Sequence, residues 1–295
     1  MKSKLAVIVL AISSMGWGLT WLPIKYLNEM GLDSLHLTLI AFASGALLFS
    51  PWLFKQYGYW KSSIGVMLMV ALAGGIANAA FQTAIAHGEV IRVMILFYML
   101  PVWSVLGGRI FLKEKIDRMR MIAVVLSLAG AAIILDVKNT SWHGISYIDV
   151  LAILSGMGLA ATNILFRFTQ NIPVLSKVAV MFMGCTVLIG ISLSLTSETK
   201  NLPESQMAIS LAVLYGAVWL ATITTGTQWA VTQMEAGRSA IIIVMELVVA
   251  VVSSAIILSA DLGANEIIGG FMVLGAALIE GSRDESGQQE VKVAA

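Results

Sequence analysis

The chain repeats itself at a spacing of 146 residues. When residues 82–133 are aligned with residues 228–279 without a gap, 14 of 52 positions are identical. The identical positions include three polar pairs: Gln82 with Gln228, Glu89 with Glu235, and Arg92 with Arg238. A weaker echo at a spacing of 142 pairs Ser13, Gly16 and Thr20 with Ser155, Gly158 and Thr162. The chain is therefore predicted to consist of one structural unit that occurs twice.

The apolar residues lie in runs of the length that crosses a bilayer as a helix. Hydrophobic residues make up 58% of the chain and charged residues only 12%, whereas a soluble domain has about 25% charged residues. About 20 apolar residues span the hydrocarbon layer. The predicted fold is an all-α integral membrane protein with ten transmembrane helices, at 5–24, 35–54, 64–86, 90–112, 121–137, 150–168, 178–195, 209–231, 239–258 and 267–279.

Each repeat contains five predicted spans, which is an odd number. The second repeat therefore enters the membrane in the opposite direction, and the two halves form inverted repeats. We expect one transmembrane domain over 1–295, with repeats at 5–137 and 150–280 and a tail at 281–295. Placing the N-terminus inside leaves 14 of the 18 Lys and Arg residues on the cytoplasmic side. The positive-inside rule then predicts cytoplasmic termini in a bacterial-type inner (plasma) membrane.

Polar side chains recur inside the predicted spans. Asn78 and Gln82 are one helical turn apart, and Thr224 and Gln228 repeat that spacing in the second half. Such stripes predict a water-filled central cavity, although hydrogen bonds between helices would also explain them. The predicted cavity residues are Trp17, Thr20, Asn78, Gln82, Tyr98, Thr162, Asn163, Thr224, Gln228 and Glu246.

Glu246 is the most costly of these residues, because a carboxylate at the membrane centre must be paired, protonated or hydrated. Two functions are open: it couples proton movement to transport, or it contacts a substrate ammonium group. The alternative is a protonated or hydrogen-bonded side chain that holds two helices together.

Four charges and one proline complete the candidate set. Glu89, Arg92, Glu235 and Arg238 lie where the fourth and ninth spans begin, and we predict that they act as gates. A simpler explanation is that each Glu complements a helix dipole. Pro101 in the fourth span predicts a kink that serves as a hinge. Its counterpart Leu247 predicts no such hinge in the second half.

The residues 88–135 resemble the fourth and fifth helices of an EamA-type repeat, which belongs to the drug/metabolite transporter superfamily. Leu100-Pro101 and Leu112-Lys113-Glu114 stand at the spacing of that family, and 17–25, WGLTWLPIK, resembles its first helix. The second half departs from the pattern, because Glu246-Leu247 stands where the family has Glu-Pro. The resemblance implies a ten-helix secondary transporter, commonly an exporter of amino acids or other small metabolites.

The sequence thus favours a secondary exporter of a small organic solute, with protons as a possible coupling ion. The wall of amides, hydroxyls and aromatic rings suggests an amino acid or a related amphipathic solute. A passive facilitator or channel would use the same cavity. An intramembrane enzyme is less favoured, because the chain lacks a His-Glu-x-x-His motif and no span pairs a nucleophile with a base. No cofactor or metal is expected.

Overall fold

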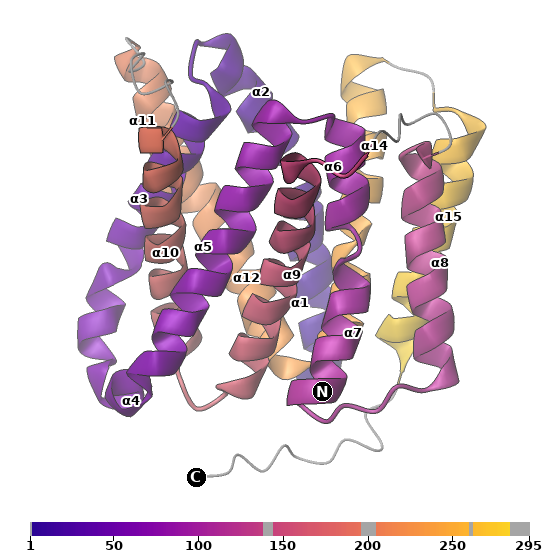
Figure 1. The fold of residues 1–295 in the computed structure, drawn as a ribbon, viewed down its shortest axis with the longest axis horizontal. Coiled ribbons are helices and arrows are strands. Elements are labelled where there is room, and N and C mark those ends of the chain that lie inside the picture. Colours follow the sequence, from indigo (N-terminus) through magenta and orange to yellow (C-terminus); the bar gives the residue numbers. More distant parts are fainter. Residues whose placement is uncertain (1, 138–143, 196–204, 260–261, 284–295) are drawn as a thin grey trace.

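The computed structural model describes residues 2–137, 144–195, 205–259 and 262–283, and every regular element among these residues is a helix (Figure 1). Of the predicted tail 281–295, only 281–283 lie within them. The first half contains α1 (Lys2–Gly18), α2 (Trp21–Glu29), α3 (Ser34–Lys55), α4 (Tyr57–Trp60), η1 (Lys61–Ser63), α5 (Ile64–His87), α6 (Val90–Phe97), α7 (Leu100–Phe111) and α8 (Arg118–Ile134). The second half contains α9 (Tyr147–Phe168), α10 (Val174–Leu195), α11 (Gln206–Leu214), η4 (Tyr215–Leu220), α12 (Ala221–Gln233), α13 (Ala236–Ile243), α14 (Met245–Leu258) and α15 (Ala264–Ser282).

Nine helical stretches in the described part of the chain are long and apolar enough to cross a membrane. They coincide with nine of the ten predicted spans, so the chain is a multi-pass membrane protein. The exception is the fifth predicted span, where α8 is a helix of 17 residues. A membrane span at α8, the fifth predicted span, therefore stays a prediction.

Several helices begin at a side chain that caps their free N–H groups. Asp33 accepts hydrogen bonds from the backbone N–H groups of Leu35 and His36 at the start of α3. Ser146 and Asp149 form a capping box at the start of α9. These local signals fix where the helices emerge from the apolar layer.

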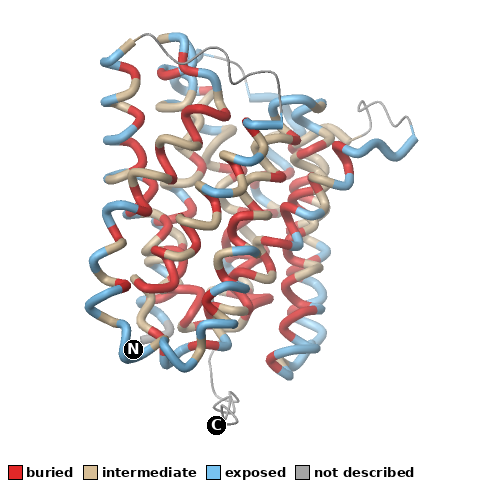
Figure 2. The backbone as a smooth tube through the Cα atoms, turned by 60° about the vertical axis from the view of Figure 1, so that its left-hand side comes forward, coloured by how far each residue is buried: buried red, intermediate tan, exposed pale blue. Residues whose placement is uncertain are grey.

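Small residues allow the central helices to approach closely. A Cβ atom on Gly158 of α9 would lie 2.9 Å from the backbone nitrogen of Ala77 in α5. A Cβ atom on Gly16 of α1 would lie 2.5 Å from Cγ2 of Ile223 in α12. Gly158 follows Gly16 by 142 positions, and Ile223 follows Ala77 by 146 positions. The two contacts are therefore equivalent in the two repeats. Figure 2 shows that buried residues are concentrated in the interior of the bundle, whereas exposed residues lie mainly at its ends and on its outer helices.

Two of the membrane-spanning helical stretches are interrupted, and the interruptions lie at equivalent positions of the two repeats. The first is interrupted at Tyr98 and Met99, between α6 and α7, and the second at Val244, between α13 and α14. Residue 244 follows residue 98 by 146 positions, and α13 follows α6 by the same spacing.

The kink expected at Pro101 is seen as the break at Tyr98 and Met99, in the turn before the proline, where its missing N–H removes a hydrogen bond. Its role as a hinge stays a prediction. Pro101 lies in the first turn of α7, after the break, where a missing N–H is tolerated. In the second half, where Leu247 replaces the proline and no hinge was predicted, the helix is nevertheless interrupted. The break at Val244 forms without a proline nearby, so proline is not what interrupts the helix there.

The two ends of the bundle can be defined by the broken helices. At the α6 edge, α5 ends at His87 and α6 begins at Val90; at the α13 edge, α12 ends at Gln233 and α13 begins at Ala236. Figure 1 shows the α6 edge at the top and the start of α1 at the bottom. The end of α15 also lies near the start of α1, because a Cβ atom on Gly281 would be 3.4 Å from Val7.

Candidate functional site

The two breaks in the helices are joined by a hydrogen bond. The hydroxyl of Tyr98, at the first break, donates to Oε1 of Glu246 at 3.2 Å. Glu246 lies in the first turn of α14, directly after the second break. A helix N-terminus is a favourable place for a carboxylate. The sequence placed Glu246 deep in a continuous helix, whereas the break gives it a helix start and a tyrosine partner.

A second polar contact joins α9 and α12. Nε2 of Gln228 donates to Oδ1 of Asn163 at 3.3 Å. Nδ2 of Asn163, Oε1 of Gln228 and the hydroxyl of Thr224 are buried without a hydrogen-bond partner. Buried polar atoms without partners are uncommon and costly. This group of side chains is therefore suited to receive water or a polar part of a solute.

The ten predicted cavity residues divide into two sets by burial. Trp17, Thr20, Asn78, Gln82 and Glu246 are partly exposed, and Tyr98, Thr162, Asn163, Thr224 and Gln228 are buried. Some are bound locally: Thr20, between α1 and α2, donates to the carbonyl of Trp17. Thr162 and Asn78 donate to carbonyls of their own helices. Trp17 reaches across to the hydroxyl of Thr227 in α12 at 3.3 Å.

Burial differs between residues that correspond in the two repeats. Gln82 is partly exposed, whereas its counterpart Gln228 is 3% exposed. All eight residues of α13 are buried. In α6, only Val93 and Phe97 are buried. The bundle is therefore more tightly closed at the α13 edge than at the α6 edge.

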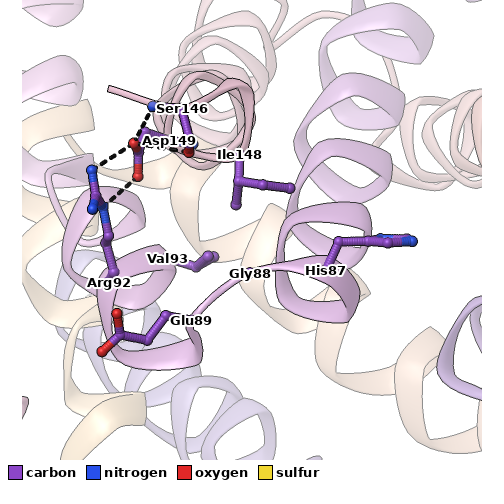
Figure 3. A pocket seen from close by; sticks show the side chains of 8 residues that line it. All are labelled: His87, Gly88, Glu89, Arg92, Val93, Ser146, Ile148 and Asp149. Carbon is purple, nitrogen blue, oxygen red and sulfur yellow. Dashed lines mark hydrogen bonds and ion pairs between the residues drawn. The ribbon is translucent and has the colours of Figure 1, made fainter. Parts of the chain in front are cut away.

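At the α6 edge, Arg92 pairs with Asp149 of α9 rather than with Glu89 (Figure 3). Its Nε and one terminal nitrogen donate to the two carboxylate oxygens at 2.6 and 2.7 Å. Glu89 is exposed at the N-cap position of α6, without a side-chain capping bond. The pair borders a cleft of about 210 Å³. Arg92 and Glu89 are thus brought to one cleft but are not partners.

At the α13 edge, a partly buried cluster of charges surrounds Arg120, which is itself buried. Its guanidinium group pairs with Glu235 at the N-cap position of α13 and lies 3.6 Å from Oε1 of Glu280 in α15. Arg283 donates to Glu280 at 2.9 Å and also pairs with Asp117. The cluster therefore links the start of α8, the start of α13 and the end of α15.

Two further groups hold the start of α13 in place. The carboxylate of Glu114 accepts the backbone N–H of Ala236 at 3.0 Å, in the first turn of α13. Arg238, the other predicted inner gate residue, donates to the carbonyls of Gly281 and Arg283 at 2.9 and 3.2 Å. Glu235 and Arg238 therefore bind separate partners rather than each other.

Sequence reasoning missed several of these residues. Asp149, Glu280 and Arg120 were not singled out, because their partners are distant in the chain. Lys177 was also missed: it is fully buried, and its ammonium group donates to the carbonyls of Phe166 and Thr169 at the end of α9. The available signal was a lysine directly before the predicted span 178–195, close enough in sequence to reach the end of the preceding helix.

The clefts do not coincide with the predicted cavity. An apolar groove of about 470 Å³ lies between α1, α10 and α12, and its lining includes Val9, Val174 and Trp229. Neither this groove nor the cleft beside Arg92 is lined by any of the ten predicted cavity residues. Within the described residues, no group of three or more metal-binding side chains is assembled.

Comparison with known families identifies the first half of the chain. Residues 4–136 match the model of the EamA-like transporter family. The matched residues make up slightly less than half of the chain. The resemblance seen in the motifs around Pro101 and Glu114 is thereby confirmed. The EamA segment ends at the last turn of the first repeat, directly after α8.

Relatives of the chain include transporters. The chain is 29% identical over 146 residues to the uncharacterized transporter YojE of Bacillus subtilis (strain 168), and this match covers 45% of the chain and 47% of that protein. The chain thus spans about half the length of this relative. It is 23% identical over 207 residues to the biotin transporter of Salmonella typhimurium (strain LT2), covering 70% of the chain and 69% of that protein.

A solved crystal structure shares the fold over nearly the whole chain. The TM-score is 0.74 at 14% sequence identity, and the match covers 96% of this chain and 99% of the other. The second repeat, which lies beyond the EamA match, is therefore part of the same known fold.

Proposed function

We propose that the chain is a secondary transporter that exports a small organic solute by alternating access. The observation that carries this proposal is the pair of breaks at Tyr98–Met99 and Val244, in register at the repeat spacing and joined through Tyr98 and Glu246. Helices interrupted at membrane depth are typical of transporter binding sites. A break in each half gives each edge of the bundle a short helix that can move separately.

The proposed architecture has ten spans in two inverted repeats. The 17 residues of α8 are at the lower end of the range of about 17–25 residues that spans a bilayer. Figure 1 supports opposite directions for the halves, because α1 starts at the bottom and α9 starts at the top. We place both termini in the cytoplasm of a bacterial-type cell, so the α13 edge faces inward.

The proposed solute path runs along the ten predicted cavity residues, with Glu246 at its centre. A carboxylate in mid-membrane costs about 3 kcal/mol on insertion scales, and the Tyr98 hydroxyl offsets part of this cost. We propose that Glu246 either exchanges a proton with the path or binds a cationic group of the solute. The alternative is that the Glu246 side chain only holds α14 against the junction of α6 and α7 through its hydrogen bond to Tyr98. In that case transport would not require its negative charge.

The solute class follows from the chemistry of the proposed wall. Amides, hydroxyls and indole rings bind the polar groups and flat surfaces of an amphipathic molecule, such as an amino acid. The partial likeness to a biotin transporter adds biotin to the solutes that are worth testing. The lipid bilayer and protons are the other proposed partners.

Counterflow tests the function directly. The purified full-length chain is reconstituted into liposomes that are loaded with one unlabelled amino acid or with biotin, and uptake of the labelled solute is followed. A carrier gives transient accumulation that depends on the internal solute. Uptake that only follows the concentration gradient, without counterflow, would identify a passive facilitator instead.

The role of Glu246 is tested by Glu246→Gln. We expect this variant to lose accumulation driven by a proton gradient while counterflow persists, because the amide cannot titrate but still accepts the Tyr98 hydroxyl. Glu29→Gln is the matched control, since Glu29 is exposed at the end of α2. Unchanged proton-driven accumulation in Glu246→Gln would rule out coupling through this residue.

A further inference from the structure

We infer that Arg120 is the positioning residue that holds the α13 edge closed, and that it thereby sets which side of the transporter is open. The inference rests on the proposed function, because it assigns a conformational role within alternating access. Arg120 lies outside the ten proposed cavity residues and the four proposed gate charges. It is 1% exposed, in the first turn of α8.

The first step is the difference between the two edges. Ala240 in α13 is fully buried, whereas Met94, its counterpart in α6, is partly exposed. Ala240 packs in a core cluster with Leu10 of α1, Leu100 of α7 and Ala230 of α12. The structure therefore represents a state in which α13 is enclosed by its neighbours and α6 is not.

The second step is the position of Arg120 between the parts that would separate. One terminal nitrogen pairs with Glu235, which precedes α13, and Nε lies 3.6 Å from Glu280 of α15. The other terminal nitrogen donates to the carbonyl of Lys115 at 3.1 Å. Opening the α13 edge would draw Glu235 away and leave a buried guanidinium group without that partner, which is strongly unfavourable.

The third step is that the pairing of Arg120 with Glu235 has no counterpart at the α6 edge. The residue 146 positions after Arg120 is Glu266, which carries the opposite charge. Glu89, the counterpart of Glu235, forms no ion pair within the described residues and is exposed. The ion pair at the α6 edge, between Arg92 and Asp149, joins α6 to α9 instead, so the contact made by Arg120 belongs to the α13 edge alone. A contact that exists in only one of two states shifts the population toward that state.

Cysteine accessibility tests the inference in the full-length chain. Two reporters, Ala240→Cys and Met94→Cys, are placed separately in a Cys185→Ala background, which removes the native thiol. A small maleimide then measures how fast each reporter is labelled. We expect Arg120→Gln to raise the labelling rate of the Ala240→Cys reporter by about tenfold, a usual scale for coupled conformational equilibria. We expect the labelling rate of the Met94→Cys reporter to fall.

Opposite changes at the two reporters distinguish a shifted equilibrium from a loosened structure, which would raise both rates. Glu235→Gln provides a second variant that removes only the partner before α13, so it decides the matter if Arg120→Gln does not yield folded protein. Arg118→Gln is the matched control, because Arg118 is exposed in the same turn of α8, and both rates should stay unchanged. Parallel increases or unchanged rates in the folded variants would overturn the role of Arg120.

The two hypotheses can fail separately. If the wild-type chain shows no counterflow but the reporters shift in opposite directions, the transport proposal falls and the lock stands. If counterflow occurs and the reporters do not shift oppositely, the lock falls and the transport proposal stands.

Discussion

At the scale of single residues, the charges of this protein choose partners that are far away in the chain. Arg92 and Asp149 are 57 positions apart, and Arg120 and Glu235 are 115 positions apart. Among the described residues, Lys177 donates to two backbone carbonyls and one hydroxyl, and the ring of Phe166 lies 4.8 Å from its nitrogen. Each arrangement lowers the cost of a charge in an apolar environment. The partner, rather than the local sequence, decides what each charge does.

Glu114 shows how burial affects a carboxyl group in the loop before α8. Burial raises the pKa of Glu114 above its ordinary value of 4.5, and the charge of Glu235 adds to the rise. The N–H of Ala236 and the charges of Arg120 and Arg167 oppose it. The folded chain therefore keeps this proton at pH values where the unfolded chain has lost it. Stability from this source is present at low pH and declines as the pH rises through the raised pKa.

Replacing Glu114 with Gln should remove this pH dependence. The amide oxygen of Glu114→Gln can still accept the N–H of Ala236, and it does not titrate. We expect the wild type to lose stability relative to Glu114→Gln as the pH rises from about 4.5 through the raised pKa. Melting temperatures in detergent over this range measure the difference. Parallel melting curves of the two proteins at all pH values would contradict the assignment.

At the scale of elements, close helix contacts depend on glycines that face backbone. A Cβ atom on Gly130 of α8 would lie 2.7 Å from the carbonyl oxygen of Gly269 in α15, and one on Gly269 would lie 2.5 Å from that of Gly130. Backbone atoms cannot move aside as a flexible side chain can. Small residues at such crossings are what allow helices to pack in lipid. The same contact keeps α15, and with it Glu280, against the helix that carries Arg120.

Gly269→Ala should separate α8 from α15. We expect a loss of about 1–3 kcal/mol in stability, the usual cost of overpacking, measured by thermal unfolding in detergent. Gly275→Ala is the control in the same helix, because its Cβ atom would lie 3.5 Å from Leu126, an ordinary contact. That control should be neutral or slightly stabilising, since alanine favours helix formation. Equal melting temperatures for the two variants would refute the close crossing.

At the scale of the whole molecule, the duplicated sequence produces matching elements with unequal environments. The helices α6 and α13 have the same length and register, but only α13 is buried throughout. An alternating-access transporter needs two similar edges that are not open together. The repeat supplies the similarity, and the two edges differ in their ion pairs: Arg120 with Glu235 at one edge and Arg92 with Asp149 at the other.

The ten-span arrangement has a direct test at α8. Single cysteines at Lys113 and at Gly144 flank this helix, and both positions are exposed. If α8 crosses the membrane, a membrane-impermeant maleimide should label Lys113→Cys from the cytoplasmic side and Gly144→Cys from the outside. Labelling of both cysteines from one side would show that α8 does not cross and would end the inverted-repeat proposal.

Much of the architecture could be predicted before the structure, because membrane insertion depends on local hydrophobicity. The apolar runs predicted nine helical spans that the structure contains. A break was predicted only at Pro101, and the structure has it in the turn before that residue. A second break lies at Val244, 146 positions after Tyr98. This second break lacks a proline, so a rule based on residue type could not find it.

The candidate site was less accessible to prediction. Residue type and helical spacing singled out Gln228, Asn163 and Glu246, and the structure gives each a polar contact across helices. Their partners could not be assigned, because hydropathy and periodicity describe one helix at a time. Asp149 and Glu280 were overlooked for the same reason: a charge near a helix end looks like a solvated end until the facing helix is known.

The sequence by itself determined that this chain enters a membrane as packed helices and that its two halves share one plan. Both properties follow from short-range patterns: the length of apolar runs and the recurrence of residues at a fixed spacing. Only the tertiary structure decided which charges meet and which edge is closed. Those outcomes depend on side chains from distant segments that share one apolar volume, where a charge is stable only beside its partner.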